Sequence, residues 1–417
     1  MDMRLASLEH RPGLAITGED LVFLTGQPTP YGMLEHLSAE WVLALRELGR
    51  RAWLLRTGVP GGMEALQALL AAGRPKAFLA FSGVNWDLLA NERSLYDVLD
   101  IPYVGLMFDD PAYFPQRHRL GSRNLTLLFT DDDHHDASRA LSPANAPRGR
   151  FRFGVRPPVD VPIEHDARTI PILFAKTPGD PDRERRSWND LAPPLRAIIN
   201  DVADAALWQD ERGLWPIVRE RLALDGITAG LDGSIGMATI VARVDHYVRL
   251  ARAVRLVRAL APHDALIVGA GWQAHLPANA RARVVPQCQM AELFAMMSTS
   301  RIVVNVQPNN RFAPHERFLS GMQRGCCVLT DAAAPIRAAV GESHFAPVRW
   351  HDALDDVVAD LVADPARVRA IGERAAPMAS DAWSATRGAA TVLRAVDTLT
   401  AMLATTSPIT LPAALSA

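Results

Sequence analysis

The chain has 417 residues, 49% of them hydrophobic, and a formal net charge of −2. This length predicts two or three domains with full cores, and the near-neutral charge argues against a nucleic-acid partner. The three cysteines, Cys288, Cys326 and Cys327, have neither metal-ligand nor disulfide spacing. The first 20 residues lack the apolar core of a signal peptide, and no apolar run is long enough to span a membrane. The sequence therefore predicts a cytoplasmic protein without a membrane span.

The first part of the chain alternates short apolar segments with helical patterns. Buried strands are expected at residues 21–25, 52–55, 77–81, 103–108 and 125–129. An amphipathic helix is expected at 34–48, and residues 154–162, rich in proline and glycine, form the best candidate for a linker. Strands that alternate with helices are typical of a parallel, doubly wound α/β sheet.

A second α/β unit is predicted to begin with a strand at 170–175, but the next convincing strand, 265–269, comes much later. The residues between them show helical patterns at 191–207, 215–222 and 237–260. An ordinary crossover needs one helix, so residues 180–262 are interpreted as a helical insertion. It either serves the acceptor side or a homo-oligomer contact, or it covers one face of the sheet.

Residues 301–331 carry the most informative pattern. A strand at 302–306, a polar loop, a helix that begins near His315 and a strand at 326–329 form a βαβ crossover. Ligands of such sheets bind at the carboxyl ends of strands, close to helix N-termini. His315, Glu316 and Arg317 at this place favour an anionic ligand; the alternative is a solvated helix start with Glu316 in its first turn.

This segment resembles the donor-binding half of GT-B glycosyltransferases, and most closely the spore maturation protein B-like (CgeB-like) group with its family 1-type C-terminal domain. The pattern consists of Asn305-Val306, His315-Glu316-Arg317, Met322, Gly325 and Thr330-Asp331, and the likeness continues to about residue 395. It implies an α/β GT-B fold with two Rossmann-like domains facing an interdomain cleft. The implied divisions are an acceptor-side domain at 1–160, a nucleotide-sugar domain at 161–383, and a terminal helix returning to the first domain, with a flexible tail, at 384–417.

The resemblance implies a glycosyltransferase that moves a hexosyl or related group from a nucleotide-diphosphate sugar to an unidentified protein, glycan or small-molecule acceptor, without a metal or other cofactor. Arg317 and Lys176, one of only two lysines in the chain, would neutralise the leaving diphosphate, and His315 would donate a hydrogen bond to phosphate or sugar. Many retaining relatives carry a glutamate where this chain has Ser320, so the donor base and the choice between retention and inversion stay open. The alternatives are a nucleotide-sugar epimerase-like enzyme and a catalytically silent binding or assembly subunit.

Other candidate residues lie at further strand ends. Asp109 and Asp110 follow a strand and are acceptor-side catalytic candidates, together with His315 and Arg317. The triplet 131–133 matches a short metal-binding pattern, although capping of a helix by Asp132 or Asp133 is favoured. The donor-binding candidates are Gly26, Gly32, Lys176, Gly269, Gly271, Gln287, Asn305, His315, Glu316, Arg317 and Ser320.

Overall fold

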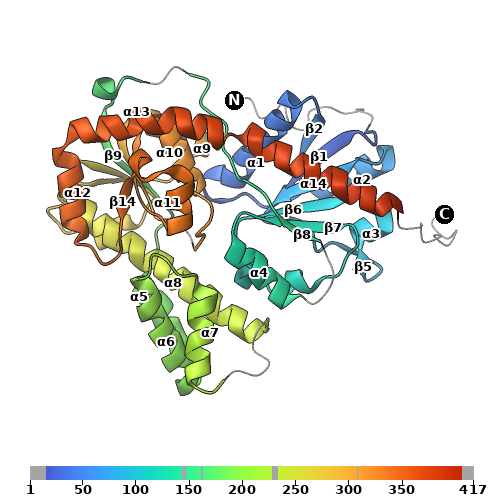
Figure 1. Ribbon diagram of the computed structural model, residues 1–417, viewed down its shortest axis with the longest axis horizontal. Coiled ribbons are helices and arrows are strands. Elements are labelled where there is room, and N and C mark those ends of the chain that lie inside the picture. Colours follow the sequence, from blue (N-terminus) through green and yellow to red (C-terminus); the bar gives the residue numbers. More distant parts are fainter. Residues whose placement is uncertain (1–15, 143–146, 161–162, 228–232, 308, 406–417) are drawn as a thin grey trace.

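The computed structural model describes residues 16–142, 147–160, 163–227, 233–307 and 309–405, and it contains two six-stranded parallel sheets (Figure 1). The first sheet has the order β2-β1-β3-β6-β7-β8 and consists of β1 (Asp20–Thr25), β2 (Arg51–Arg56), β3 (Ala77–Phe81), β6 (Tyr103–Met107), β7 (Leu125–Phe129) and β8 (Arg148–Arg150). The second has the order β11-β10-β9-β12-β13-β14 and consists of β9 (Ile170–Ala175), β10 (Ala265–Val268), β11 (Arg283–Val285), β12 (Ser300–Asn305), β13 (Cys327–Asp331) and β14 (Ala346–Val348). The predicted pair of doubly wound sheets is confirmed.

The helices follow the alternation expected of such sheets. Those of the first part are α1 (Met33–Glu47), α2 (Gly62–Ala72), α3 (Leu95–Leu99) and α4 (Asp132–Leu141), with a short hairpin of β4 (Leu89–Ala90) and β5 (Arg93–Ser94). The insertion contains α5 (Pro181–Arg186), α6 (Pro193–Leu207), α7 (Leu214–Leu224) and α8 (Ile235–Leu260). The remaining helices are α9 (Met290–Ser298), α10 (Glu316–Gln323), α11 (Ala334–Val340), α12 (Leu354–Ala363), α13 (Pro365–Ala382) and α14 (Ala385–Thr405). None of the described helices is long and apolar enough to cross a membrane.

Each sheet has a point where the strand order reverses, and these points position the site. In the second sheet the chain proceeds outward from β9 to β11 and then returns to β12 on the other side of β9. In the first sheet the reversal lies between β1 and β3. Helices on opposite faces diverge at such a point and leave a crevice at the carboxyl ends of the strands. The residues that follow these ends are Gly26 after β1, Ser82 after β3, Lys176 after β9, and the loop to His315 after β12.

The chain passes between the sheets twice, along neighbouring paths. Val155 forms a parallel bridge with Ser384, and the Nε1–H of buried Trp41 donates to the Gly154 carbonyl at 3.0 Å. A Cβ on Gly154 would lie 2.3 Å from the Ser384 carbonyl oxygen, so the two segments approach this closely because residue 154 is glycine. After this passage α14 packs on α1 of the first part (Figure 1).

The helical insertion contacts both halves. Its apolar cluster includes Trp188 and Trp215 together with Ala112 and Ala137 of the first part. The 26-residue helix α8, roughly 40 Å long at 1.5 Å per residue, continues from that cluster to the second sheet, where its residues 253–260 pack in the core. The insertion therefore lies beside α4 as well as beneath the second sheet, as Figure 1 shows.

Candidate active site

Three cavities with shared walls occupy the space between the carboxyl edges of the two sheets. Their volumes are about 270, 230 and 320 Å³, and Arg249 of α8 lines all three. Asp109 lines the first and third, and Lys176 lines the second and third. The cavities thus form one cleft whose walls come from the first sheet, the second sheet and the insertion.

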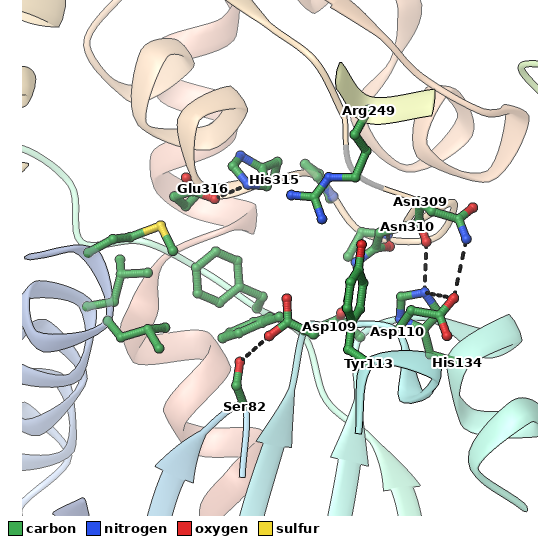
Figure 2. Close-up of a pocket in the computed structure, with 18 of the residues that line it drawn as sticks. Ser82, Asp109, Asp110, Tyr113, His134, Arg249, Asn309, Asn310, His315 and Glu316 are labelled. Carbon is green, nitrogen blue, oxygen red and sulfur yellow. Dashed lines mark hydrogen bonds and ion pairs between the residues drawn. The ribbon is translucent and has the colours of Figure 1, made fainter. Parts of the chain in front are cut away.

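Asp109 is half-buried, whereas the other acids that line the first cavity, Asp110, Asp245 and Glu316, are buried. It follows β6, and its Oδ2 accepts a hydrogen bond from the Ser82 hydroxyl at 2.8 Å. The described part of the chain gives Oδ1 no hydrogen-bond partner. Figure 2 shows Asp109 pointing into the cavity, towards the side that His315 and Glu316 occupy. Its free oxygen can therefore accept a proton or a hydrogen bond from a ligand.

Asp110, the other acidic candidate, is held by neighbours from three parts of the chain. It caps a short 3-10 helix (Pro111–Tyr113) by accepting from the Ala112 amide at 2.8 Å. It also accepts from Trp215 Nε1 of the insertion at 3.0 Å and from Asn309 Nδ2 of the second half at 3.3 Å. Burial raises the pKa of Asp110, while nearby His134 lowers it. These partners make Asp110 an organiser of the cleft wall rather than a group free to take a proton.

Arg249 is positioned by a carboxylate on its own helix. Asp245 lies one turn earlier on α8, 3.6 Å from the guanidinium, and accepts a hydrogen bond from the Tyr113 hydroxyl at 2.6 Å. Tyr113 belongs to the first part, so this pair attaches the insertion to the first sheet. Arg249 projects into the cavity opposite Asp109 and Tyr113 (Figure 2).

The start of α10 carries an internally paired group of charges. Nδ1 of His315 accepts from the Arg317 amide at 3.4 Å, so Nε2 carries the proton and faces Glu316 Oε2 at 2.6 Å. Burial lowers the pKa of His315 to about 4, despite the opposing effect of Glu316. Burial alone would raise the pKa of Glu316, but His315 and Arg317 lower it to about 2. His315 is therefore neutral at pH 7, and both ring nitrogens have partners, so the hydrogen bond to a ligand predicted for it requires an exchange of partners.

Lys176 is a buried lysine that forms no ion pair with the described residues. Its side chain follows β9 and is 9% exposed. The described residues place no carboxylate in an ion pair with it, and Arg317, which also lines the second cavity, donates to the Ala175 carbonyl just before it. Burial, followed by Arg249 and Arg317, lowers the pKa of Lys176 well below its ordinary 10.5. An anion in this cavity would favour the protonated form of Lys176 and offset the cost of burying its charge beside Arg249 and Arg317.

The acidic triplet joins the two halves through Asp131 and Asp133. Asp131 caps α4, and its Oδ2 accepts from the Arg311 and Phe312 amides at 2.5 and 3.0 Å. Asp133 pairs with the Arg311 guanidinium at 2.7 Å. We call these four residues the interdomain latch. The expected helix N-cap exists, but Asp131 provides it rather than Asp132 or Asp133. The described ranges contain no group of three His, Cys, Asp or Glu side chains able to hold a metal ion.

The loop between Gly26 and Gly32 reaches the second half. Tyr31, at φ 64°, donates its hydroxyl to the Val268 carbonyl at 3.1 Å. Gly32 has φ +62°, and a Cβ there would lie 2.7 Å from Gln289 Oε1. Glycine is thus required both by the left-handed backbone and by the close approach. Tyr31 lines the same cavity as Arg317, which places this loop and the start of α10 across one cleft.

Besides Gly26 and Gly32, five donor-binding candidates lie outside the cavity lining. Gly269 and Gly271, at φ 137° and 110°, shape the turn after β10, where Trp272 is buried and donates to the Lys176 carbonyl. Asn305 is buried and donates to Thr330 at 3.0 Å. The structure places the remaining two away from the three cavities, Gln287 exposed and Ser320 fully buried in α10.

Several cleft residues were missed in the sequence. Arg249 and Asp245 lie in a helix that the periodicity assigned to an insertion. Tyr113 ends a short 3-10 helix and Ser82 lies in a turn, and neither belongs to a motif. The spacing of Asp245 and Arg249, one helical turn apart, is a weak signal that also describes many solvent-exposed ion pairs. Only the tertiary arrangement shows that this pair faces the cleft.

Comparison with known proteins bears on the fold and on one region of the chain. Residues 249–394 match a family described as glycosyl transferase-like. A search of curated proteins gave no match. An alpha-glucosyltransferase solved in complex with UDP and a 13-mer DNA containing a central A:G mismatch is similar in structure over 92% of this chain and 100% of its own, with 10% identity and a TM-score of 0.50.

Two other solved structures align over similar lengths. Sucrose-phosphate synthase from Thermosynechococcus elongatus shares 14% identity over 92% of this chain and 100% of its own, with a TM-score of 0.49. Anabaena Alr3699/HepE in complex with UDP-glucose shares 11% identity over 91% of this chain and 99% of its own, also with a TM-score of 0.49. From the family match, the strand topology and the alpha-glucosyltransferase likeness, the chain has a GT-B fold and carries a glycosyl transferase-like region at residues 249–394.

Proposed function

We propose that this protein transfers a sugar from a nucleotide-diphosphate donor to an acceptor hydroxyl in the cleft between the two sheets. The proposal depends on one observation: Asp109, whose Oδ1 accepts no hydrogen bond from the described residues, and Lys176, which forms no ion pair with them, line the same cleft from opposite halves. It includes the division into domains at 1–160, 161–383 and 384–417 and the affiliation with the CgeB-like group.

The cations of the second cavity support a diphosphate as the leaving group. Lys176, Arg249 and Arg317 line this cavity from a strand end, the insertion helix and the start of α10. In the transfer step the acceptor oxygen bonds to the anomeric carbon, the bond from that carbon to the diphosphate breaks, and the acceptor proton passes to Asp109. Fixed cations around the leaving group stabilise its developing charge and provide for a metal-independent reaction.

A panel of nucleotide sugars and free nucleotides, screened by thermal shift, tests the proposal directly. Ligands that bind the folded state raise its melting temperature, so the preferred base and sugar emerge together. Bound donors are then incubated with the protein and analysed for hydrolysis, transfer and epimerisation. Epimerisation without an acceptor would favour the epimerase-like alternative, and binding without any turnover would favour a silent assembly subunit that uses the insertion as its interface. Failure of every nucleotide to bind would overturn the proposal.

Arg317→Ala is expected to weaken binding of the preferred donor by about 1.5–3 kcal/mol, the range for a charge-assisted hydrogen bond. Calorimetry with and without a chelator measures the loss and tests metal independence together. Arg369→Ala is the matched control because Arg369 pairs with Asp166 at the surface and lines none of the three cavities. Unchanged affinity in a folded Arg317→Ala protein would remove this arginine from the site, and affinity lost in chelator would contradict metal independence.

Binding of a nucleoside diphosphate is expected to be coupled to proton uptake by Lys176. Burial, followed by Arg249 and Arg317, holds the pKa of Lys176 well below 10.5, and a neighbouring anion favours its charged form and raises that pKa. Between the two values binding therefore takes up a proton, which calorimetry in buffers of different ionisation enthalpy measures. Lys176→Met should abolish the uptake, whereas Lys76→Met, at a lysine paired with Asp397 outside the cleft, should retain it. Equal uptake in wild type and Lys176→Met would show that another group titrates.

A further inference from the structure

The first cavity has one wall of hydrocarbon and one of polar groups. The apolar wall consists of Met33, Leu34, Leu37, Phe108 and Phe153. The polar wall carries Asp109, Tyr113, Arg249 and Asn309. Figure 2 shows Tyr113, Arg249 and Asn309 on the side away from a group of sticks that carry no nitrogen or oxygen, with Asp109 between the two. Lys176 and Arg317 line the second cavity but not the first. Of the three cations assigned to the diphosphate, Arg249 alone also lines this mixed cavity.

We infer that the acceptor is a compact molecule with an apolar body and a single reactive hydroxyl, rather than a saccharide. This inference depends on the proposed transferase function and assigns its acceptor class. A saccharide seated here would turn hydroxyls towards Leu34, Leu37 and Phe108, which offer no hydrogen-bond partner. Burying polar groups in this way is unfavourable, whereas an aromatic or aliphatic body gains by leaving water.

The position of Asp109, the half-buried acid of this cavity, fixes the orientation of the acceptor. Asp109 follows β6 directly after Phe108, so hydrocarbon and base are adjacent along the chain. The other acids of the cavity are buried as well as paired: Asp110 with Trp215, Asp245 with Tyr113, and Glu316 with His315. A hydroxyl at the edge of an apolar body therefore meets the half-buried carboxylate of Asp109, whose Oδ1 accepts no hydrogen bond from the described residues. Its oxygen bonds to the anomeric carbon, the bond to the diphosphate breaks, and its proton moves to Asp109.

The dimensions of the cavity favour a compact body over a polymer. Its volume of about 270 Å³ lies just below the roughly 300–1,000 Å³ of pockets that hold drug-sized ligands. Its walls come from α1, the first sheet, α8 and the loop before α10. A free small aromatic or alicyclic alcohol fits these limits better than a long-chain lipid alcohol, which has the same chemistry at its hydroxyl end.

The test compares acceptors with the protein saturated with the nucleoside diphosphate of its preferred donor. Binding of benzyl alcohol and naphthalenemethanol is measured beside that of glucose, maltose and micellar dodecanol, and transfer is then assayed with the donor. We expect the aromatic alcohols to bind and to accept the sugar, with kcat/KM at least about tenfold above the saccharides and dodecanol. Such discrimination is within the range that one or a few apolar groups in a pocket provide.

Leu34→Gln places an amide on the apolar wall and should lower kcat/KM for aromatic alcohols by about tenfold or more, with donor affinity unchanged. Leu43→Gln is the matched control, because Leu43 lies on the same helix, is also half-buried and lines none of the three cavities. No aromatic binding, equal or better transfer to saccharides, or equal effects of the two substitutions would overturn the inference. Preferred transfer to dodecanol would overturn the inference that the acceptor is a compact molecule. Absence of nucleotide binding would instead refute the transferase proposal itself.

Discussion

Asp109→Asn is expected to lower kcat for glycosyl transfer by about 10²–10⁴-fold, the contribution of a positioned general base, and to leave donor affinity unchanged. The substitution keeps the size of the side chain and an oxygen that can accept from the Ser82 hydroxyl, so the local geometry is preserved. It removes the proton acceptor alone. Rapid-quench measurement of transfer with the preferred donor, together with donor calorimetry, separates the chemical step from binding.

Asp110→Asn is the matched comparison because the two carboxylates are neighbours in the chain and differ in their partners. Asp110 accepts hydrogen bonds from Ala112, Trp215 and Asn309. Its substitution should therefore lower the melting temperature, and it should affect kcat only by changing the shape of the cleft wall. Ser82→Ala removes one hydrogen bond to Asp109 and should reduce kcat by about tenfold or less. If Asp109→Asn kept more than a tenth of wild-type kcat, or if Asp110→Asn lost more activity with an intact fold, Asp109 would not be the base.

The strands and the donor side of the cleft could be anticipated because they depend on local patterns. Buried parallel strands read as continuous apolar runs, and residues 170–175, 302–306 and 326–329 all showed this. The sheet edges β8 and β14 escaped because they are three residues long, and β8 reads Arg-Gly-Arg. The place of Lys176 after β9 followed from the rule for strand ends.

The acceptor side could not be read in the same way because it is assembled from distant segments. Arg249 enters the cleft only because α8 extends from the second sheet to the first half, and helical periodicity does not encode that path. Asp109 and Asp110 looked equivalent in sequence, since both follow one strand. Their difference arises from Trp215 and Asn309, more than a hundred residues away, which occupy one carboxylate and not the other.

Asp131→Ala is expected to open the interdomain latch and to destabilise the protein by about 2–4 kcal/mol. Asp131 is 1% exposed and accepts from four backbone amides, two in α4 and two, those of Arg311 and Phe312, in the loop of the second half. Loss of a helix N-cap costs about 1 kcal/mol, and buried donors left without partners cost about 1–3 kcal/mol more. Chemical unfolding measures the sum, and hydrogen exchange should show faster exchange of the Arg311 and Phe312 amides.

Asp132→Ala is the control, because Asp132 is the next residue, its side chain is 40% exposed and it pairs only with Arg150 at the surface. A surface pair of this kind contributes at most about 1 kcal/mol. The latch also supports the start of α10, because Phe312 precedes His315 by only three residues. The Gln307 side chain holds the same loop by donating to the Ala313 carbonyl and accepting from the His315 amide. Asp131→Ala should therefore weaken donor binding as well, and Asp132→Ala should not. Equal stability of the two variants would show that other contacts hold the two halves together. A destabilised Asp131→Ala protein with wild-type donor affinity would show that the latch does not position the start of α10.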